Sequence, residues 1–304
     1  MEPECSSDND CSRIVGLERC NSGRCETRGI LAQNAATGCE TSVDATAGTD
    51  LKPYCTPQLA VTHALNIGPP LVVLRGAFTS GMVIDGNLEV EGDPSLPPTL
   101  TGEGTGLEAG TAIEVIGSFT FSLTGLNITR WSQGLSSAEA ATISLSKTQF
   151  NNCSTSLDLA EGTHNLSEVS ITGGFSATLN GDLHADQLVV NNLQVGVVCN
   201  ASNGSECDLR NSRIEQSGRL GPGAFIASGP VVTLIGNEFI NNLGTAVFLS
   251  MNGEAVASFS DNKFFDNAGY GVDCDVNDTF VGENNEFNNN ERGPEDSVCT
   301  IYRP

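Results

Sequence analysis

The sequence is poor in basic residues. Its 304 residues include 14 Lys and Arg against 37 Asp and Glu, which gives a formal net charge of −23 at pH 7. A chain with so few cations offers no surface that neutralises many phosphates, so we expect neither nucleic acid nor anionic lipid as a partner. No apolar run approaches the roughly 20 residues that span a bilayer, and the opening MEPEC lacks the basic and apolar regions of a signal peptide. We therefore expect no membrane span, and a native signal or anchor outside this sequence.

Pairs of cysteines with zinc-finger spacing are also absent, although the chain contains 11 cysteines. A reducing cytosol would keep these side chains as thiols, so their number favours an extracellular or cell-envelope protein. The first four lie in the polar stretch CSSDNDCSRIVGLERCNSGRC, which is too short and too poor in apolar residues to hold itself together without disulfides. No histidine is near it, which argues against a metal site there.

The spacing of these four cysteines resembles the small disulfide modules near the N-terminus of many bacterial envelope lipoproteins. The resemblance covers only residues 5–25. In those modules the first cysteine often pairs with the third and the second with the fourth. The resemblance therefore implies the disulfides Cys5–Cys20 and Cys11–Cys25, and a lipid anchor in a segment outside this sequence.

A repeated phrase points to the fold of the rest of the chain. VTLIGNEFINNLG ends at Gly244 and the similar ASFSDNKFFDNAG ends at Gly269. The same frame extends in both directions as a column of apolar residues at intervals of 19 to 25 residues, the range of solenoid repeats: Ile128, Phe150, Ile171, Val190, Ile214, Phe239, Phe264 and Phe287. Further columns five and seven residues earlier are also mainly apolar, which gives the two-residue alternation of a strand with its inner face buried.

Polar residues flank this column at fixed positions. Asparagines recur two residues before it, at Asn237, Asn262 and Asn285, and three residues after it, at Asn242, Asn267 and Asn290. Asparagine suits a tight corner because it tolerates left-handed backbone angles, and identical amides on successive turns can bond one another in a ladder. One residue before the column, the charges alternate in sign along Arg213, Glu238, Lys263 and Glu286, which predicts ion pairs between stacked parallel strands about 4.8 Å apart.

Rung length and the L-x-x-N-x-F corner resemble those of the right-handed parallel β-helix proteins, the architecture of the pectate-lyase and polygalacturonase superfamily. The resemblance covers roughly residues 55–302. It implies an all-β solenoid of about nine to ten rungs over residues 68–304, preceded by a linker and cap helix over 31–67. The N-terminal cysteines place the disulfide-stapled module over 1–30. Such a cap shields an end of the stack that would otherwise expose backbone donors and apolar side chains. Leucine-rich repeats have a similar period, but their LxxLxLxxN phrase is absent.

The remaining cysteines fit a solenoid. Their spacing makes three further disulfides plausible, Cys39–Cys55 before the cap helix, Cys199–Cys207 around a small polar loop, and Cys274–Cys299 at the last rung. Cys153 falls in the column of corner asparagines, so we predict a buried free thiol that behaves as a small apolar group.

Catalytic signatures of the resembled superfamily are missing. Polygalacturonase-like hydrolases are marked by NTD, DD, GHG and RIK, none of which occurs here, and lyase-like elimination needs a strong base with a calcium site that neutralises the uronate. The most interesting basic group is Arg130 with Lys147 one rung later, because Trp131, the only tryptophan, could stack on a sugar ring. We take these three residues as a candidate binding site. The alternative is that Trp131 fills a corner of the core.

The histidines add little in this register. His164 falls in an inward column and is expected in the core, His184 falls one residue off that column and is expected to face solvent, and His63 lies in the expected cap helix. We expect no histidine to lie beside two acidic residues on a common outer face.

One acidic stretch resembles half of a calcium loop. DCDVND supplies Asp273, Asp275 and Asn277, but Asp278 replaces the turn glycine of an EF-hand and Asn284 replaces its bidentate glutamate. We therefore expect no cofactor, with calcium as the alternative.

Two classes of function follow. The first is a non-catalytic secreted or cell-surface β-helix that serves binding, adhesion or surface display, with a glycan or a surface protein as partner. The second is a carbohydrate-active enzyme, a polysaccharide lyase or glycoside hydrolase, with a divergent site. The missing motifs favour the first.

Overall fold

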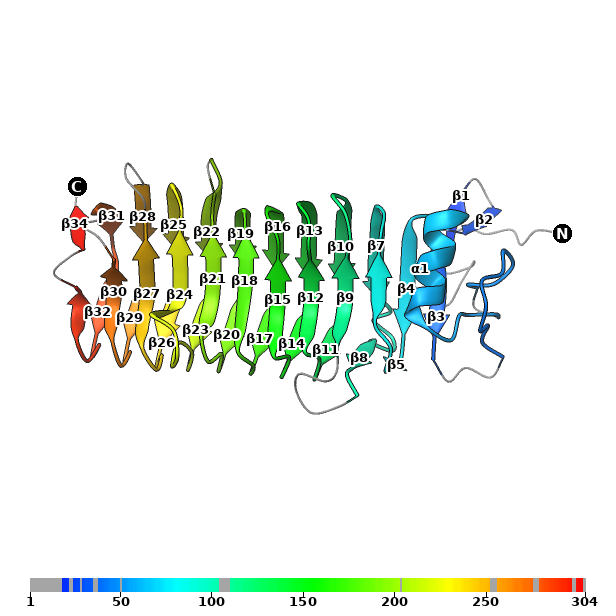
Figure 1. Cartoon of the computed structure of the whole chain (residues 1–304), viewed down its shortest axis with the longest axis horizontal. Coiled ribbons are helices and arrows are strands. Elements are labelled where there is room, and N and C mark those ends of the chain that lie inside the picture. Colours follow the sequence, from blue (N-terminus) through cyan, green and yellow to red (C-terminus); the bar gives the residue numbers. More distant parts are fainter. Residues whose placement is uncertain are drawn as a thin grey trace.

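The chain forms an elongated stack of rungs, seen from the side in Figure 1. The structure is a computed structural model, and it describes residues 18–21, 24–27, 29–34, 38–49, 51–103, 110–202, 204–251, 256–275, 279–296 and 299–302. Each regular rung contributes one strand to each of three parallel sheets, which we call sheets I, II and III. The prediction of an all-β parallel solenoid is confirmed. In the described part, sheets II and III contain ten strands each, which agrees with the predicted nine to ten rungs.

Sheet I is the longest, with twelve described strands. They are β3 (Ile30–Gln33), β4 (Leu71–Arg75), β7 (Leu88–Gly92), β10 (Thr120–Thr124), β13 (Ala141–Ser146), β16 (Gly162–Ser167), β19 (Asp182–Asp186), β22 (Glu206–Arg210), β25 (Val231–Ile235), β28 (Val256–Ser260), β31 (Thr279–Glu283) and β34 (Thr300–Tyr302). The first of these, β3, lies within the segment expected to be a linker and pairs with β4, so the sheet begins before the helix.

Sheet II has short strands. They are β5 (Ala77–Phe78), β8 (Thr99–Thr101), β11 (Asn127–Thr129), β14 (Gln149–Asn151), β17 (Ser170–Thr172), β20 (Val189–Asn191), β23 (Arg213–Glu215), β26 (Glu238–Ile240), β29 (Lys263–Phe265) and β32 (Glu286–Asn288). Sheet III consists of β6 (Met82–Ile84), β9 (Thr111–Val115), β12 (Gln133–Ser137), β15 (Thr155–Leu159), β18 (Ser176–Asn180), β21 (Gly196–Asn200), β24 (Gly223–Ser228), β27 (Thr245–Ser250), β30 (Tyr270–Cys274) and β33 (Gly293–Glu295). A separate antiparallel hairpin joins β1 (Glu18–Asn21) to β2 (Arg24–Thr27).

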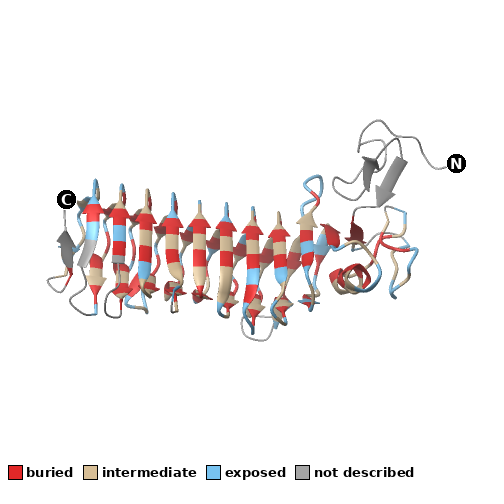
Figure 2. Ribbon diagram, turned by 90° about the horizontal axis from the view of Figure 1, so that it is seen from above, coloured by how far each residue is buried: buried red, intermediate tan, exposed pale blue. Residues whose placement is uncertain are grey.

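The predicted apolar column lies in register along sheet II. Its members are fully buried from Ile128 to Phe264, and Phe287 is partly buried against them. Successive phenylalanine rings stack, with centroids 5.2 Å apart between Phe239 and Phe264 and 4.7 Å apart between Phe264 and Phe287. Figure 2 shows that bands of buried and more exposed residues repeat from rung to rung along the stack. Burial of this column supplies the hydrophobic free energy that holds the rungs together.

The asparagine ladders are confirmed. Nδ2 of Asn237 donates to Oδ1 of Asn262 at 3.0 Å, and Nδ2 of Asn262 donates to Oδ1 of Asn285 at 2.9 Å. The second ladder links Asn242, Asn267 and Asn290 in the same way. Because the stacked amides also bond backbone groups, such as the carbonyl of Leu234, no polar group of Asn262 is left unpaired in the core.

Left-handed backbone occurs one residue before the first ladder. Gly236, Asp261 and Asn284 have φ values of 67°, 57° and 54°. The expectation that the stacked asparagines themselves supply this conformation is therefore wrong. The left-handed residue lies at the outer edge of the corner. The side-chain amide of the asparagine that follows it points into the core and bonds the asparagine of the next rung.

The alternating charges form ion pairs on the outer surface of sheet II. Nη1 of Arg213 lies 3.0 Å from Oε2 of Glu238, and Nζ of Lys263 lies 3.1 Å from Oε1 of the same carboxylate. The pair with Lys263 is the main reason that the pKa of Glu238 lies below its ordinary value. Glu286 lies opposite Lys263 in register. The predicted ion pairs are therefore present between Arg213, Glu238 and Lys263, and among the described residues none joins Lys263 to Glu286.

The expected cap helix is α1 (Pro57–Asn66), which contacts β3, β4 and β6 at the end of the stack opposite β32 and β33 (Figure 1). Oγ1 of Thr56 caps its first turn by accepting from the N–H of Leu59, and Pro57 suits the first helical position. Among the residues that the structure describes, no helix is long and apolar enough to cross a membrane.

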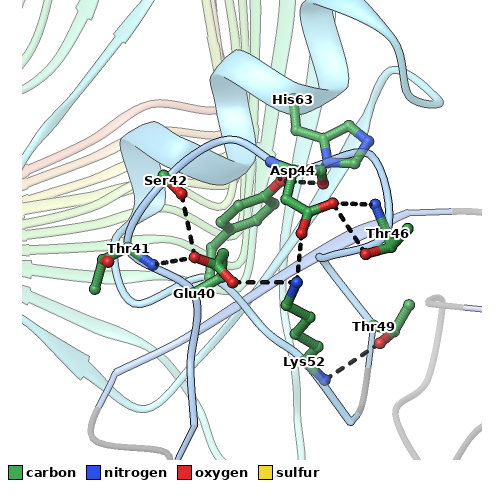
Figure 3. A network of polar contacts seen from close by, with 9 residues as sticks. Glu40, Thr41, Ser42, Asp44, Thr46, Thr49, Lys52 and His63 are labelled. Carbon is green, nitrogen blue, oxygen red and sulfur yellow. Dashed lines mark hydrogen bonds and ion pairs between the residues drawn. The ribbon is translucent and has the colours of Figure 1, made fainter.

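A polar network ties the segment before the helix to the helix itself (Figure 3). The hydroxyl of Tyr54 donates to the carbonyl oxygen of Asp44 at 2.8 Å and lies 2.7 Å from Nδ1 of His63, which is buried. Lys52 pairs with Asp44 and Glu40, and these contacts hold the pKa of both carboxyls below their ordinary values. Tyr54 is fully buried, so this network has a structural role in the cap.

Three of the predicted disulfides are present, Cys39–Cys55, Cys199–Cys207 and Cys274–Cys299. Cys153 is a buried free cysteine, as predicted, and burial raises the pKa of its thiol. For the first module, the hairpin makes the backbones of Cys20 and Cys25 direct partners. The predicted pairs Cys5–Cys20 and Cys11–Cys25 themselves involve residues or side chains outside those that the structure describes.

Candidate functional site

A trough follows the outer face of sheet I. Side chains alternate along each strand, so every second residue points outward, and the parallel register stacks these residues into columns. One outward column runs through Ser122, Ser144, Asn165, His184 and Asp208, and a second through Thr124, Ser146, Ser167, Asp186 and Arg210. Together they line an open hollow of about 280 Å³.

The trough is hollow because its outward side chains are small on three successive strands. β10, β13 and β16 present serine, threonine and Asn165, whereas β19 and β22 present ionisable side chains, including the bulkier His184 and Arg210. The described residues that line the hollow include no Phe, Tyr or Trp. The surface therefore offers rows of hydroxyl and amide groups next to a cluster of ionisable groups.

The ionisable cluster is centred on His184. Its Nδ1 lies 3.3 Å from Oε1 of Glu206 and 4.0 Å from Oδ2 of Asp208. One ligand atom of each of the three residues lies within 4.8 Å of the other two. The side chain of Asp208 is 13% exposed, against 40% for His184 and 41% for Glu206, so the carboxylate of Asp208 sits deepest in the cluster.

Neighbouring groups hold the carboxylates in place. Nε of Arg210 donates to both oxygens of Asp208, at 2.8 and 3.0 Å, and this contact raises the pKa of the arginine above its ordinary value. The backbone N–H of Glu206 donates to Oδ1 of Asp182 at 2.9 Å, and Nδ2 of Asn211 donates to Oδ1 of Asp186 at 2.8 Å. The cluster is therefore acidic overall, with Arg210 already paired.

This cluster was not predicted from the sequence. The expectation that no histidine lies beside two acidic residues on a common outer face is wrong, because His184 lies beside Glu206 and Asp208. The signal was present in the register: His184 lies six residues before Val190, and Asp208 lies six residues before Ile214. The prediction that His184 faces solvent and that His164 lies in the core is confirmed. His164 is fully buried, and its Nε2 lies 2.8 Å from the carbonyl oxygen of Asn180.

Arg130, Trp131 and Lys147 do not converge on one surface. Trp131 is 5% exposed, and its indole N–H donates to the carbonyl oxygen of Leu100 at 3.1 Å, so it fills a corner of the core, as the alternative interpretation held. Arg130 follows β11 and Lys147 precedes its neighbour β14. The two exposed bases therefore lie at opposite ends of the sheet II strands.

The half calcium loop lies on another sheet. Asp273 is on β30 of sheet III, and Oδ2 of Asp275 accepts from the hydroxyl of Ser250 at 2.6 Å. Burial, and then the neighbouring carboxylate of Asp296, raise the pKa of Asp273. Asn277 and Asp278 lie outside the described residues, so calcium binding here stays a prediction.

Comparison with known proteins agrees with this architecture. The fold and the stacked corners define a parallel β-solenoid. The family model described as the right-handed β-helix region matches residues 111–299, so the chain belongs to that family. No curated protein matches the sequence, so the resemblance of the N-terminal cysteines to lipoproteins has no support from a curated relative.

Three solved structures resemble the chain. An alginate lyase from Paenibacillus sp. str. FPU-7 is 15% identical, with a TM-score of 0.52 over 80% of this chain and 96% of that one. The A-module of the mannuronan C-5 epimerase AlgE4 from Azotobacter vinelandii is 12% identical, with a TM-score of 0.37 over 89% of this chain and 100% of that one. The Agl-KA catalytic domain is 11% identical, with a TM-score of 0.40 over 92% and 71%. At 15% identity, the likeness to the alginate lyase shows the fold alone.

Proposed function

We propose that this chain is an exported, non-catalytic β-helix protein that binds a saccharide chain in the trough of sheet I. The observation that carries the proposal is the continuous row of small hydroxyl and amide side chains that line the trough and end at the His184 cluster. The groups sit on rigid parallel strands about 4.8 Å apart, so little conformational entropy is lost when they bind a ligand.

The chemistry of the lining suits hydroxyl-rich ligands. Serine and threonine hydroxyls both donate and accept, and the amide of Asn165 does the same, which matches the mixed donors and acceptors of a sugar ring. The part of the lining that the structure describes has no Phe, Tyr or Trp, so it lacks the apolar contribution that stacking rings supply. We therefore expect modest affinity that depends on the length of chain held across several rungs.

Charge sets the expected class of saccharide. Asp186 and Asp208 line the trough and Glu206 lies beside it, whereas Arg210 is paired with Asp208. A polyuronate would place further carboxylates next to these, and like charges at close range are unfavourable. We therefore expect neutral polysaccharides to bind more tightly than polyuronates in the absence of added metal ions.

A carbohydrate-active enzyme is the second candidate. The observation that favours it is the imidazole of His184 beside the carboxylates of Glu206 and Asp208 in an open trough, since histidine and carboxyl groups are the usual general acids and bases. Against it, elimination from a uronate needs a group that neutralises the uronate carboxylate, and the nearest cation, Arg210, is paired with Asp208.

Export is part of the proposal. The three described disulfides require an oxidising compartment to form and persist. We place the protein outside the cell or in the cell envelope.

A polysaccharide panel tests both candidates. The protein is incubated with neutral glucans, mannans and xylans and with alginate and pectate, and binding is followed by isothermal titration calorimetry. The same mixtures are assayed for new reducing ends and for absorbance of unsaturated uronates. We expect binding of at least one neutral polysaccharide without turnover. Turnover that disappears in His184→Ala would establish the enzymatic alternative, and failure to bind any member would contradict saccharide recognition.

A further inference from the structure

We propose that His184, Glu206 and Asp208 form a binding site for a divalent transition-metal ion of the zinc class. The three side chains come from the neighbouring strands β19 and β22, and each offers one ligand atom to a common point on the outer face of sheet I. The cluster is not acidic alone, because one of its three ligand atoms is an imidazole nitrogen. The proposal is independent of saccharide binding and is tested without a glycan.

The spacing of the ligand atoms fits a small ion. Zinc lies about 2.0–2.2 Å from nitrogen and oxygen ligands, so two ligands of a tetrahedral site are roughly 3.4 Å apart. Nδ1 of His184 and Oε1 of Glu206 are 3.3 Å apart, and Nδ1 and Oδ2 of Asp208 are 4.0 Å apart. All three ligand atoms lie within 4.8 Å of one another, so rotations of the partly exposed side chains of His184 and Glu206 are needed to bring them to coordination distance.

The surrounding structure prepares two of the ligands. Nε of Arg210 bonds both oxygens of Asp208 and so orients that carboxylate. A carboxylate has about four lone-pair sites, so Oδ2 can accept from Arg210 and still face a metal ion. The backbone N–H of Glu206 is held by Asp182, which adds negative charge next to the site. Such outer contacts are the features that fix ligands and strengthen metal binding.

The ligand types select the ion. Calcium and magnesium prefer six or more oxygen ligands, whereas an imidazole nitrogen with carboxylates suits zinc, nickel or copper. Three protein ligands leave at least one coordination position open, and the adjoining trough gives solvent or a small ligand access to it. The site therefore has the composition of an open metal centre and lacks the fourth protein ligand of a structural one.

Direct titration of metal ions tests the site. Untagged, oxidised protein is stripped with a chelator and titrated with Zn²⁺, Ni²⁺, Ca²⁺ and Mg²⁺ by calorimetry, and Cu²⁺-loaded protein is examined by electron paramagnetic resonance. We expect one Zn²⁺ per chain at this site, at least tenfold weaker binding of Ca²⁺ and Mg²⁺, and hyperfine coupling of Cu²⁺ to one imidazole nitrogen.

Variants assign the binding to these residues. His184→Ala and Glu206→Gln should each weaken Zn²⁺ binding at least tenfold, and His184→Ala should abolish the nitrogen coupling. The control Glu114→Gln makes the same change of charge on the outer face of sheet III and should alter binding less than twofold. Circular dichroism and the protection of the Cys153 thiol show that each variant folds. Undetectable Zn²⁺ binding in the unaltered protein, unchanged binding in His184→Ala, or equal affinity for Ca²⁺ would each overturn the proposal.

Discussion

His184 on β19 lies directly opposite Asp208 on β22, with 4.0 Å between Nδ1 and Oδ2. The two residues are 24 positions apart in the sequence, and the chain that connects them contains the loop closed by Cys199–Cys207. Because the loop leaves the register of the flanking strands intact, the imidazole and the carboxylate meet at one end of the trough. The proposed metal site depends on this pair, and the saccharide site ends at it.

Removal of one buried amide should destabilise the solenoid. In Asn262→Ala, the backbone N–H and Nδ2 of Asn237 lose their acceptor and the carbonyl oxygen of Leu234 loses its donor. Since a buried group left without a partner costs about 1–3 kcal/mol, we expect a loss of roughly 3 kcal/mol or more in the free energy of unfolding, measured with urea. The control Asn288→Ala, on an exposed side chain, should change it by less than about 0.5 kcal/mol. Equal losses of unfolding free energy in the two variants would show that the asparagine ladder does not stabilise the fold.

Acid should destabilise the fold through its buried histidines. Burial lowers the pKa of both His63 and His164 below that of the unfolded chain, so the unfolded state binds more protons near neutral pH. Stability from these groups is complete above the unfolded pKa of about 6.5 and declines as the pH falls from there toward the lower folded pKa. His164→Leu should therefore reduce the loss of unfolding free energy between pH 7.5 and pH 5. An unchanged pH dependence in this variant would contradict a neutral, buried His164.

The thiol of Cys153 should react slowly in the folded protein. It is fully buried and burial raises its pKa, so both access and thiolate fraction are low. We expect a thiol reagent to label the native protein far more slowly than the urea-unfolded protein, and Cys153→Ser to remove the thiol that unfolding exposes. Rapid labelling of Cys153 under native conditions would show that this corner of the core opens readily.

Cysteine pairing in the N-terminal module remains a prediction of the resemblance. Peptide mapping without reduction should recover Cys5–Cys20 and Cys11–Cys25 together with the three pairs seen in the structure. Recovery of Cys5–Cys11 or of Cys20–Cys25 would contradict the pairing that the resemblance implies.

The sequence predicted the core better than the surface. The inward column from Ile128 to Phe287 and the ladder through Asn262 could be predicted because each rung packs against a similar rung. The same type of residue therefore recurs at the same position of every repeat. The candidate site lacks such repetition. Arg130 and Trp131 are adjacent in sequence, but Arg130 itself adopts the left-handed backbone of the corner, with φ of 59°. Its side chain is exposed, whereas that of Trp131 is buried.

No sequence motif marks the trough. It arises from an absence of bulk at positions such as Ser122 and Ser144, and small polar residues are common on any exposed strand. Only their position in the outward column next to His184 gives them a shared surface. In the same register that defines the inward column, His184 and Asp208 occupy the same outward position on neighbouring rungs.

The most direct test of saccharide recognition is to fill the trough. Ser144→Phe places a large side chain in the lining on β13, and Ser136→Phe places the same side chain at an outward position of β12 on sheet III. Affinities of both variants are measured by calorimetry against the neutral polysaccharide that the unaltered protein binds most tightly. We predict at least a tenfold loss of affinity for Ser144→Phe and less than a twofold change for Ser136→Phe. Full affinity in Ser144→Phe, with its fold intact, would contradict the assignment of the trough as the binding site.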